Sequence, residues 1–233
     1  MNLQTINHDI IQCRKCPRLV EWRERIAAEK TRRFADWDYW GRPVPGFGDA
    51  SARLLIIGLA PAAHGANRTG RMFTGDRSGD WLYRALHRAG FANQPASESR
   101  EDGLQLRDCY ITALCHCAPP GNKPVPEEFA NCAPYLAAEM DHFLQQWNAL
   151  PGGKAILCLG QLSFRHTLEM LEREGWGPFK PRPQFRHGAE VSLSGQIRLF
   201  ASFHPSQQNT FTGKLTGEMW EGVFRGIREW MGG

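Results

Sequence analysis

Four cysteines of this chain fall into two pairs that together could hold a metal. Cys13 and Cys16 form a CxxC pair near the start, and Cys117 and Cys132 lie farther on with fourteen residues between them. Four thiolates suit zinc or an iron–sulfur cluster, so the pattern leaves the metal open. The alternative is simple burial, because CxxC occurs often by chance and C-x14-C is not a general zinc-finger spacing.

The other three cysteines need a separate explanation. Cys109 and Cys158 lie inside apolar, strand-like runs, where burial is the ordinary fate of a free cysteine. Cys115 lies two residues before Cys117 and could be the metal ligand in its place. Seven cysteines in a reducing compartment are better explained by metal binding or burial than by disulfides.

A glycine-rich loop, GLAPAAHGANRTGRMFTGD (58–76), follows the apolar run RLLIIGLA (53–60). It contains neither GxGxxG nor the Gly-Lys-Ser/Thr ending of a P-loop, so the standard nucleotide-phosphate motifs are excluded. The side chains that it offers are those of His64, Asn67, Arg68, Phe73 and Asp76. Asp76 could do chemistry or could merely cap a helix that we expect to begin near Ser78, and the residues at 64, 67 and 68 could simply brace the loop.

A second polar loop follows the apolar run IRLFASFHP (197–205). His204 lies at the end of this run, before a proline and a stretch rich in amide and hydroxyl groups. A lone histidine in such a place is often only structural. Ligands of open α/β sheets bind at the carboxyl ends of strands, however, and His204 and the glycine-rich loop both occupy such ends.

Strand-like runs alternate with helical patterns along most of the chain. The expected strands are 53–60, 107–117, 154–160 and 197–205, and the expected helices are 78–90, 124–147, 161–175 and 216–233. Segment 176–190 is a proline-rich, basic excursion. This order predicts a three-layer α/β/α fold with a central four-stranded, mainly parallel sheet.

Length and composition set the limits of the interpretation. At 233 residues and 42% hydrophobic content we expect a single domain, 1–233, with an N-terminal extension, 1–52, that carries two of the metal cysteines. The net charge of +4 is compatible with a polyanion partner but does not demand one. No secretory signal and no apolar run of about 20 residues is present, so we expect a soluble cytoplasmic protein.

Several long motifs in a fixed order resemble one known family. GLAPAAHG-NRTGR-FTGD-SG, CAPP-NKP, HPSQQNTFTG and the four-cysteine layout are similar to the uracil-DNA glycosylase superfamily, and within it to the iron–sulfur family 5, or B-type, enzymes. The resemblance spans about residues 13 to 220. It implies a base-excision-repair glycosylase that flips uracil out of DNA and hydrolyses the N-glycosidic bond. It also implies a structural 4Fe–4S cluster on Cys13, Cys16, Cys117 and Cys132.

The resemblance assigns roles within the two loops. His204 is expected to hydrogen-bond the uracil carbonyl as charge builds there, and Phe73 to stack on the base. Asn122 would contact the base or sugar. The backbone at Gly58 and Ala60 would approach the extruded nucleotide closely.

The sequence also departs from related families. They carry a polar, water-activating side chain where this chain has Leu59 and Ala60, so the resemblance to family 5 shifts that role to Asp76. An amide of related families is replaced by Ala113. We therefore expect a broader pocket, which also accepts other deaminated or alkylated bases such as hypoxanthine and ethenocytosine.

The expected partner is a uracil-containing DNA duplex, bound by a monomer associated with the nucleoid, with no membrane contact. The residues expected to contact DNA are Arg68, Arg71, Ser206, Gln207, Asn209, Phe211 and Leu215. Phe211 or Leu215 would be the apolar wedge that fills the emptied base stack. Two other functions remain open: a nucleic-acid-binding module without turnover, and a zinc-stapled hydrolase of free nucleosides.

Overall fold

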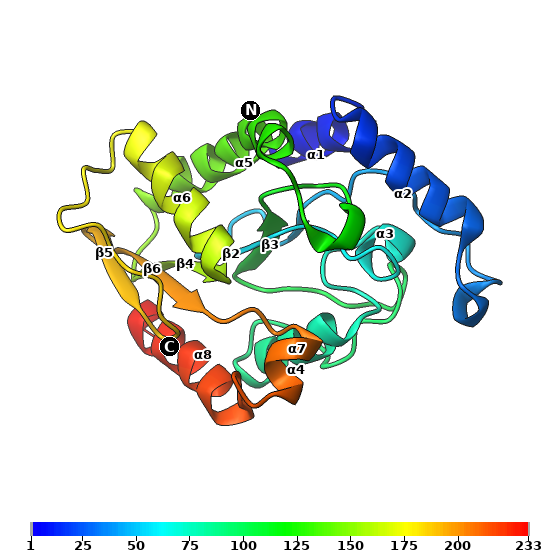
Figure 1. The fold of residues 1–233 in the computed structure, drawn as a ribbon. Helices are drawn as coiled ribbons and strands as arrows, with labels where there is room; N and C mark the ends of the chain where they lie inside the picture. Colours follow the sequence, from blue (N-terminus) through cyan, green and yellow to red (C-terminus); the bar gives the residue numbers. More distant parts are fainter. Residues whose placement is uncertain (1, 233) are drawn as a thin grey trace.

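Six strands form one mixed sheet at the centre of the computed structural model, which describes residues 2–232 (Figure 1). The strands are β1 (Phe47–Gly48), β2 (Leu54–Gly58), β3 (Cys109–Ala113), β4 (Lys154–Leu159), β5 (Glu190–Ser194) and β6 (Ile197–Ser202). Their order across the sheet is β1-β3-β2-β4-β6-β5.

The expected count of four strands was wrong, because two antiparallel edge strands complete the sheet. The four strands expected from the sequence, β3, β2, β4 and β6, are parallel neighbours in the middle. β1 pairs antiparallel with β3, and β5 pairs antiparallel with β6. β1 is only two residues long, and β5, with the sequence EVSLS, lacks the continuous apolar run of a central strand.

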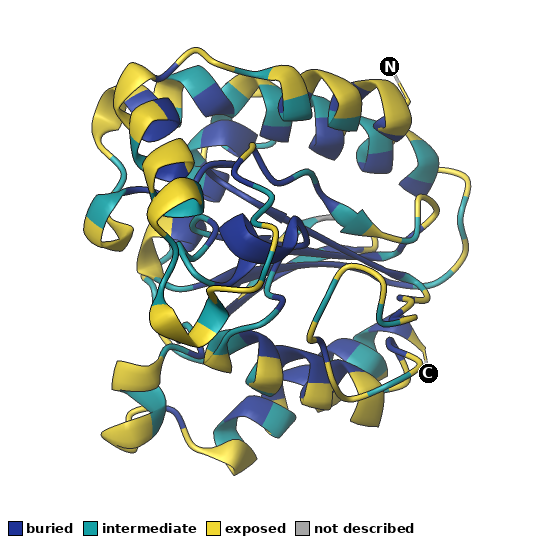
Figure 2. Cartoon of the chain, turned by 90° about the vertical axis from the view of Figure 1, so that its right-hand side faces the viewer, coloured by how far each residue is buried: buried dark blue, intermediate teal, exposed yellow. Residues whose placement is uncertain are grey.

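Helices cover both faces of the sheet. One core contains α1 (Leu3–Gln12), α5 (Pro126–Trp147) and α6 (Gln161–Arg173), and the opposite core contains α4 (Arg77–Arg88) and α8 (Gly217–Met231). The central strands are almost fully buried between these layers (Figure 2). In β2, Leu54 and Ile56 face one core while Leu55 and Ile57 face the other, as the two-residue period of a strand requires.

The other helical elements either lie in the N-terminal segment or are short. They are α2 (Pro17–Glu29), the short helices α3 (Ala66–Thr69) and α7 (Gln207–Phe211), and the 3₁₀ turns η1 (Arg32–Phe34) and η2 (Pro120–Asn122). The expected extension 1–52 includes Met1 and the expected helix 216–233 includes Gly233, and these two residues lie outside the described residues. No helix in the described chain is long and apolar enough to cross a membrane.

The sheet topology defines where a ligand would bind. β3 and β4 lie on opposite sides of β2, so the chain crosses over β2 between them. A crevice forms outside the carboxyl ends of strands at such a switch point, next to Gly58 at the end of β2. The glycine-rich loop begins there and ends at α4, which starts at Arg77, one residue before Ser78, and has Asp76 as its N-cap.

Candidate active site

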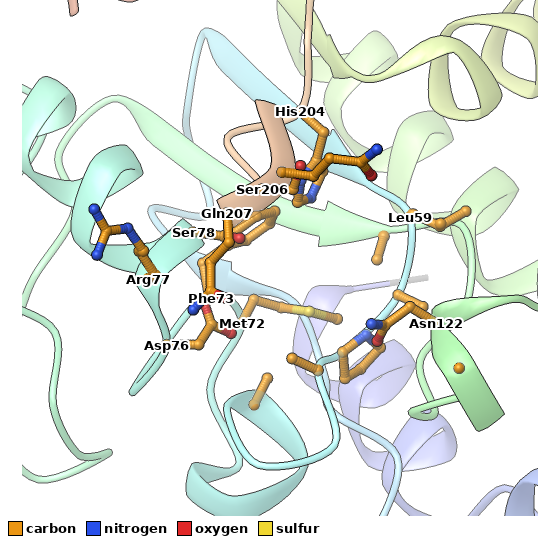
Figure 3. Close-up of a pocket in the computed structure, with 17 residues that line it drawn as sticks. Leu59, Met72, Phe73, Asp76, Arg77, Ser78, Asn122, His204, Ser206 and Gln207 are labelled. Atoms are coloured by element: carbon orange, nitrogen blue, oxygen red, sulfur yellow. The ribbon is translucent and has the colours of Figure 1, made fainter. Parts of the chain in front are cut away.

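A cavity of about 680 Å³ lies at this switch point (Figure 3). Its walls come from the glycine-rich loop, the end of β3, the η2 turn and the start of α7. A volume of this size is typical of small-molecule sites. The cavity brings together five of the six residues expected to act on the base or the water, namely Ala60, Phe73, Asp76, Asn122 and His204, and Ser206 and Gln207 line it as well.

Asp76 is fixed by the loop at the N-terminus of α4. Its Oδ1 accepts a hydrogen bond of 2.9 Å from the backbone N–H of Gly79, so it caps the helix. The other carboxylate oxygen lies against Gly65, where a Cβ atom would come within 2.2 Å of Oδ2. Burial of the carboxyl raises the pKa of Asp76 above its usual 3.8. A partly desolvated carboxylate at a cavity wall can accept a proton from water.

Phe73 is held in a strained conformation that turns its ring into the cavity. Its φ of +53° lies in the left-handed region, which non-glycine residues adopt only where the surrounding structure imposes it. Gly58 lies beneath the ring, since a Cβ there would be 3.0 Å from two ring carbons. The backbone carbonyl of Phe73 packs on Gly79. The loop therefore presents a flat apolar surface suited to stacking on a base.

His204 faces Phe73 from the end of β6. The two ring centroids are 5.9 Å apart and the ring planes differ by 30°. The carbonyl of His204 accepts a hydrogen bond of 2.8 Å from Asn209 Nδ2, which fixes the backbone. No group among the described residues hydrogen-bonds to the imidazole, so its N–H is free for a ligand. Burial lowers the pKa of His204 to about 4, so the ring is neutral at pH 7.

The other residues expected to contact the base occupy different positions around the cavity. Gly58 is buried beneath Phe73 and does not line the cavity itself, whereas Ala60 does. Asn122 lies in the η2 turn with a φ of +57° and an exposed side chain at the cavity wall. Leu59 and Ala113 are also in the wall and provide no polar group.

Arg68 is buried, which contradicts its expected contact with DNA. Only 3% of the residue is exposed. Its guanidinium carbon lies 3.9 Å from the ring centroid of Phe34 and 4.0 Å from that of Trp37. The same guanidinium donates to the carbonyl of Gly75, and Nε donates to that of His64. Arg68 therefore braces the loop from within.

Arg71 is equally inaccessible to a DNA phosphate. It is 3% exposed and forms a two-pronged ion pair with Asp102, at 2.7 and 2.8 Å. Its Nε donates to Thr74 Oγ1 at 2.9 Å. The expectation of a DNA contact was wrong here too, because every face of the guanidinium is used to fasten the loop.

The loop after His204 contains one wedge candidate rather than two. Leu215 is fully buried in the core with α4 and α8, so it cannot enter DNA. Phe211 is 66% exposed at the end of α7. Ser206 caps α7 by accepting from the N–H of Asn209, while Gln207 is exposed at the cavity mouth.

The four expected metal ligands lie near one another. Cys16 and Cys117 pack together with Leu19, and Cys132 and Cys13 are close enough to both thiols to influence them electrostatically. Burial, the main cause, raises the pKa of Cys117 to about 12. As they stand, no three His, Cys, Asp or Glu side chains of the described residues form a group that could hold a metal ion.

The surroundings of these thiols fit an anionic group. Arg23 is 2% exposed, donates to Cys117 Sγ at 2.8 Å, and leaves its buried Nε without a partner. A buried guanidinium directed at a sulfur favours a thiolate there. The donor set therefore suits a thiolate-bound cluster. Cys115 is also buried and lies close enough to Cys132 for the two thiols to influence each other electrostatically, so it stays an alternative ligand.

A buried acid lies behind the end of β3. Glu139 of α5 is fully buried, accepts from Thr112 Oγ1 at 2.5 Å and from Tyr110, and lies 3.9 Å from His116 Nε2. Burial raises the pKa of Glu139 to about 8 and lowers that of His116 to about 4. Neither is charged at neutral pH, so they do not form an ion pair.

The raised pKa of Glu139 predicts how the free energy of unfolding changes with pH. Between pH 6.5 and 8 folded Glu139 keeps a proton that the unfolded chain releases, so the free energy of unfolding should fall as pH rises. Below pH 6.5 the depressed pKa of His116 acts in the opposite sense. Denaturant unfolding across this range tests the prediction. Glu139→Gln should flatten the slope, and an equal slope in both proteins would contradict it.

Sequence patterns did not reveal every residue of the site. Met72, Arg77 and Gln208 line the cavity, and Gly65 supports the Asp76 carboxylate. Arg77 directly follows Asp76 in the sequence, and this position could have indicated that it lies at the site. Gly65 could not, since its role depends on a contact across the folded loop.

Comparison with known proteins adds independent information. Residues 45–227 match the family model described as "Uracil DNA glycosylase superfamily". A type-5 uracil-DNA glycosylase of Mycobacterium bovis is 50% identical, over 97% of this chain and 81% of its own length. One of Thermus thermophilus is 46% identical, over 94% of each chain. A type-4 uracil-DNA glycosylase of Pyrobaculum aerophilum is 30% identical, over 88% of this chain and 84% of its own.

Proposed function

The chain belongs to the uracil-DNA glycosylase superfamily, and we infer that it is a base-excision-repair glycosylase that hydrolyses the N-glycosidic bond of uracil in DNA. One observation carries this inference. The Asp76 carboxyl, the free His204 imidazole and the Phe73 ring all face one cavity at the switch point of the sheet. A base extruded from the duplex would meet a stacking surface, a hydrogen-bond donor and a proton acceptor there.

His204 stabilises the leaving base in this mechanism. As the bond between C1′ and N1 breaks, its electron pair moves into uracil and increases the charge on the carbonyl oxygens. The neutral imidazole donates its N–H to one of these oxygens. A donor already in place in a desolvated cavity stabilises the developing anion without reorganisation.

Asp76 activates the attacking water. The deoxyribose gains positive charge as the base leaves, and the oxygen of a water molecule bonds to C1′. The ionised carboxylate orients this water and takes its proton. Its support against Gly65 and Gly79 fixes the direction of the carboxylate, as efficient proton transfer requires.

We further propose that the cavity accepts damaged bases other than uracil. Ala113 contributes only a methyl group at the end of β3, and Leu59 and Ala60 are also apolar. Without a fixed amide on that wall, the site lacks a partner that would reject other base edges. Hypoxanthine and ethenocytosine are therefore expected substrates.

A panel of duplexes, each with one lesion, tests this breadth. Uracil, hypoxanthine and ethenocytosine should all be released, and Ala113→Asn should favour uracil over the other two. Thermal unfolding of the variant serves as the folding control. Activity confined to uracil would contradict the broad pocket, whereas release from no duplex would favour a binding module without turnover.

Phe211 is the proposed wedge, since it is the exposed apolar side chain of the loop after His204. Its insertion between base pairs would fill the place of the extruded nucleotide.

We also propose that the protein acts as a monomer on nucleoid DNA. Light scattering, which should give 26.3 kDa, tests the monomer.

We propose a structural 4Fe–4S cluster held by Cys13, Cys16, Cys117 and Cys132. The packing of Cys16 with Cys117 and the buried Arg23 directed at Cys117 support this proposal. Such a cluster would tie the N-terminal segment to β3 and α5. Hydrolysis needs no electron transfer, so its role would be to stabilise the fold.

The proposal predicts a brown protein with four irons and four sulfides per chain. Cys16→Ser should lose most of the iron. Cys158→Ala, a change in a buried strand, should retain it, and Cys115→Ala should also retain it if Cys117 is the ligand. A colourless protein with stoichiometric zinc after anaerobic purification would exclude iron.

A further inference from the structure

Of the three arginines in residues 58–77, which are the glycine-rich loop and the first residue of α4, one is accessible to DNA. Arg68 and Arg71 are buried, but Arg77, which directly follows Asp76, is exposed. It lines the mouth of the cavity, and its guanidinium points away from the cavity centre (Figure 3). Within the described chain no carboxylate lies within 4.0 Å of this guanidinium, so its charge is not neutralised by the protein.

Arg77 also contacts the proposed wedge. Its guanidinium carbon lies 4.1 Å from the ring centroid of Phe211, at the end of α7. α7 and α4 come from segments more than a hundred residues apart, yet they lie side by side (Figure 1), and residues of both line the cavity. This contact links α4, the helix capped by Asp76, to α7, the helix that ends at Phe211.

The geometry leaves the guanidinium able to bind an anion. An arginine stacked on a ring uses its flat face, while its N–H groups stay at the edge of the plane. No hydrogen bond from these N–H groups is found among the described residues. A phosphate oxygen pair matches the spacing of such a free edge.

We propose that Arg77 binds a DNA phosphate beside the extruded nucleotide while remaining in contact with Phe211. The wedge and the loop that carries Asp76 would then engage DNA as one unit. Arg77 is thus a positioning residue that acts through Phe211 and the phosphate. This inference rests on the proposed glycosylase function, because it needs a flipped nucleotide at the cavity.

The first test measures the charge of Arg77 through the salt dependence of binding. The ligand is a duplex with a tetrahydrofuran abasic analogue, which the enzyme cannot cleave. In Arg77→Gln the slope of log K against log salt should become shallower by about 0.9, the contribution of one phosphate contact. Arg77→Lys should keep the wild-type slope.

Arg88→Gln is the matched control. It removes the same charge from an exposed position at the far end of α4, about 16 Å away along the helix. Its slope should equal that of the wild type. An unchanged slope in Arg77→Gln, or an equal change in Arg88→Gln, would overturn the phosphate contact.

The second test measures the stack, with 2-aminopurine fluorescence beside the uracil as the signal of base flipping. Arg77→Lys keeps the charge but lacks the flat guanidinium, so its signal should fall as in Phe211→Ala. The double variant should lose no more than Phe211→Ala alone. Additive losses would overturn the link between the two side chains.

Uracil release by the wild type is measured in parallel. If the wild type releases no uracil, the proposed function fails and this inference fails with it. If it releases uracil while Arg77→Gln keeps the full salt slope, only the inference about Arg77 fails.

Discussion

Replacing Asp76 with asparagine should slow uracil release under single-turnover conditions by a factor of roughly 100 to 10,000, the usual contribution of a general base. Asparagine has nearly the same shape, and its side-chain oxygen can still accept from the N–H of Gly79. The helix cap is therefore kept while the proton acceptor is lost. DNA binding should be unchanged or slightly tighter, because one negative charge has been removed.

Asp76→Ala separates the two roles of the residue. It removes both the base and the cap, so it should also lower the free energy of unfolding by about 1 kcal/mol. Thr216→Ala is the matched control for the cap, since Thr216 caps α8 in the same way. It should lose similar stability and keep its activity. If Asp76→Asn were fully active, Asp76 would be only a cap.

The second large effect is expected at His204. His204→Ala removes the donor aimed at the leaving base and should lower the single-turnover rate roughly 100- to 1,000-fold. His142→Ala, which changes a histidine on α5 that hydrogen-bonds the carbonyl of Ala50, is the control and should have little effect. A rate near that of the wild type would show that the donor is another group.

The pH profile of the same reaction distinguishes a neutral from a charged imidazole. The pKa of His204 is depressed to about 4, so the rate should show no inflection near pH 6.5. Asp76 must be ionised to accept a proton, and its pKa is raised above 3.8. The rate should therefore fall as pH falls through that raised value. A loss of activity as pH rises through 6.5 would indicate a cationic His204.

Much of the fold follows from local patterns. The four central strands are largely apolar runs, because nearly all of their residues are buried between the two helical layers, and such runs are visible in the sequence. The edge strand β5 escapes notice because Glu190 and Ser192, both exposed, interrupt the apolar run. Asp76, Phe73 and His204 could be placed at strand ends, and the cavity does bring them together.

The errors concern residues whose environment is set by distant parts of the chain. Nothing near Arg68 in the sequence indicates that Phe34 and Trp37, some thirty residues earlier, enclose its guanidinium. Arg71 is likewise buried by Asp102. Leu215 lies in a polar loop, yet the packing of α8 draws it into the core. Burial of this kind is a tertiary property that local composition does not encode.

The most direct test of the central claim is the amount of free uracil released from a uracil-containing duplex by excess enzyme. The wild type should release one uracil per duplex and leave an abasic site, while Asp76→Asn should bind the same duplex and release uracil at least 100-fold more slowly. A wild type that binds the duplex without releasing uracil, or an Asp76→Asn variant as fast as the wild type, would contradict it.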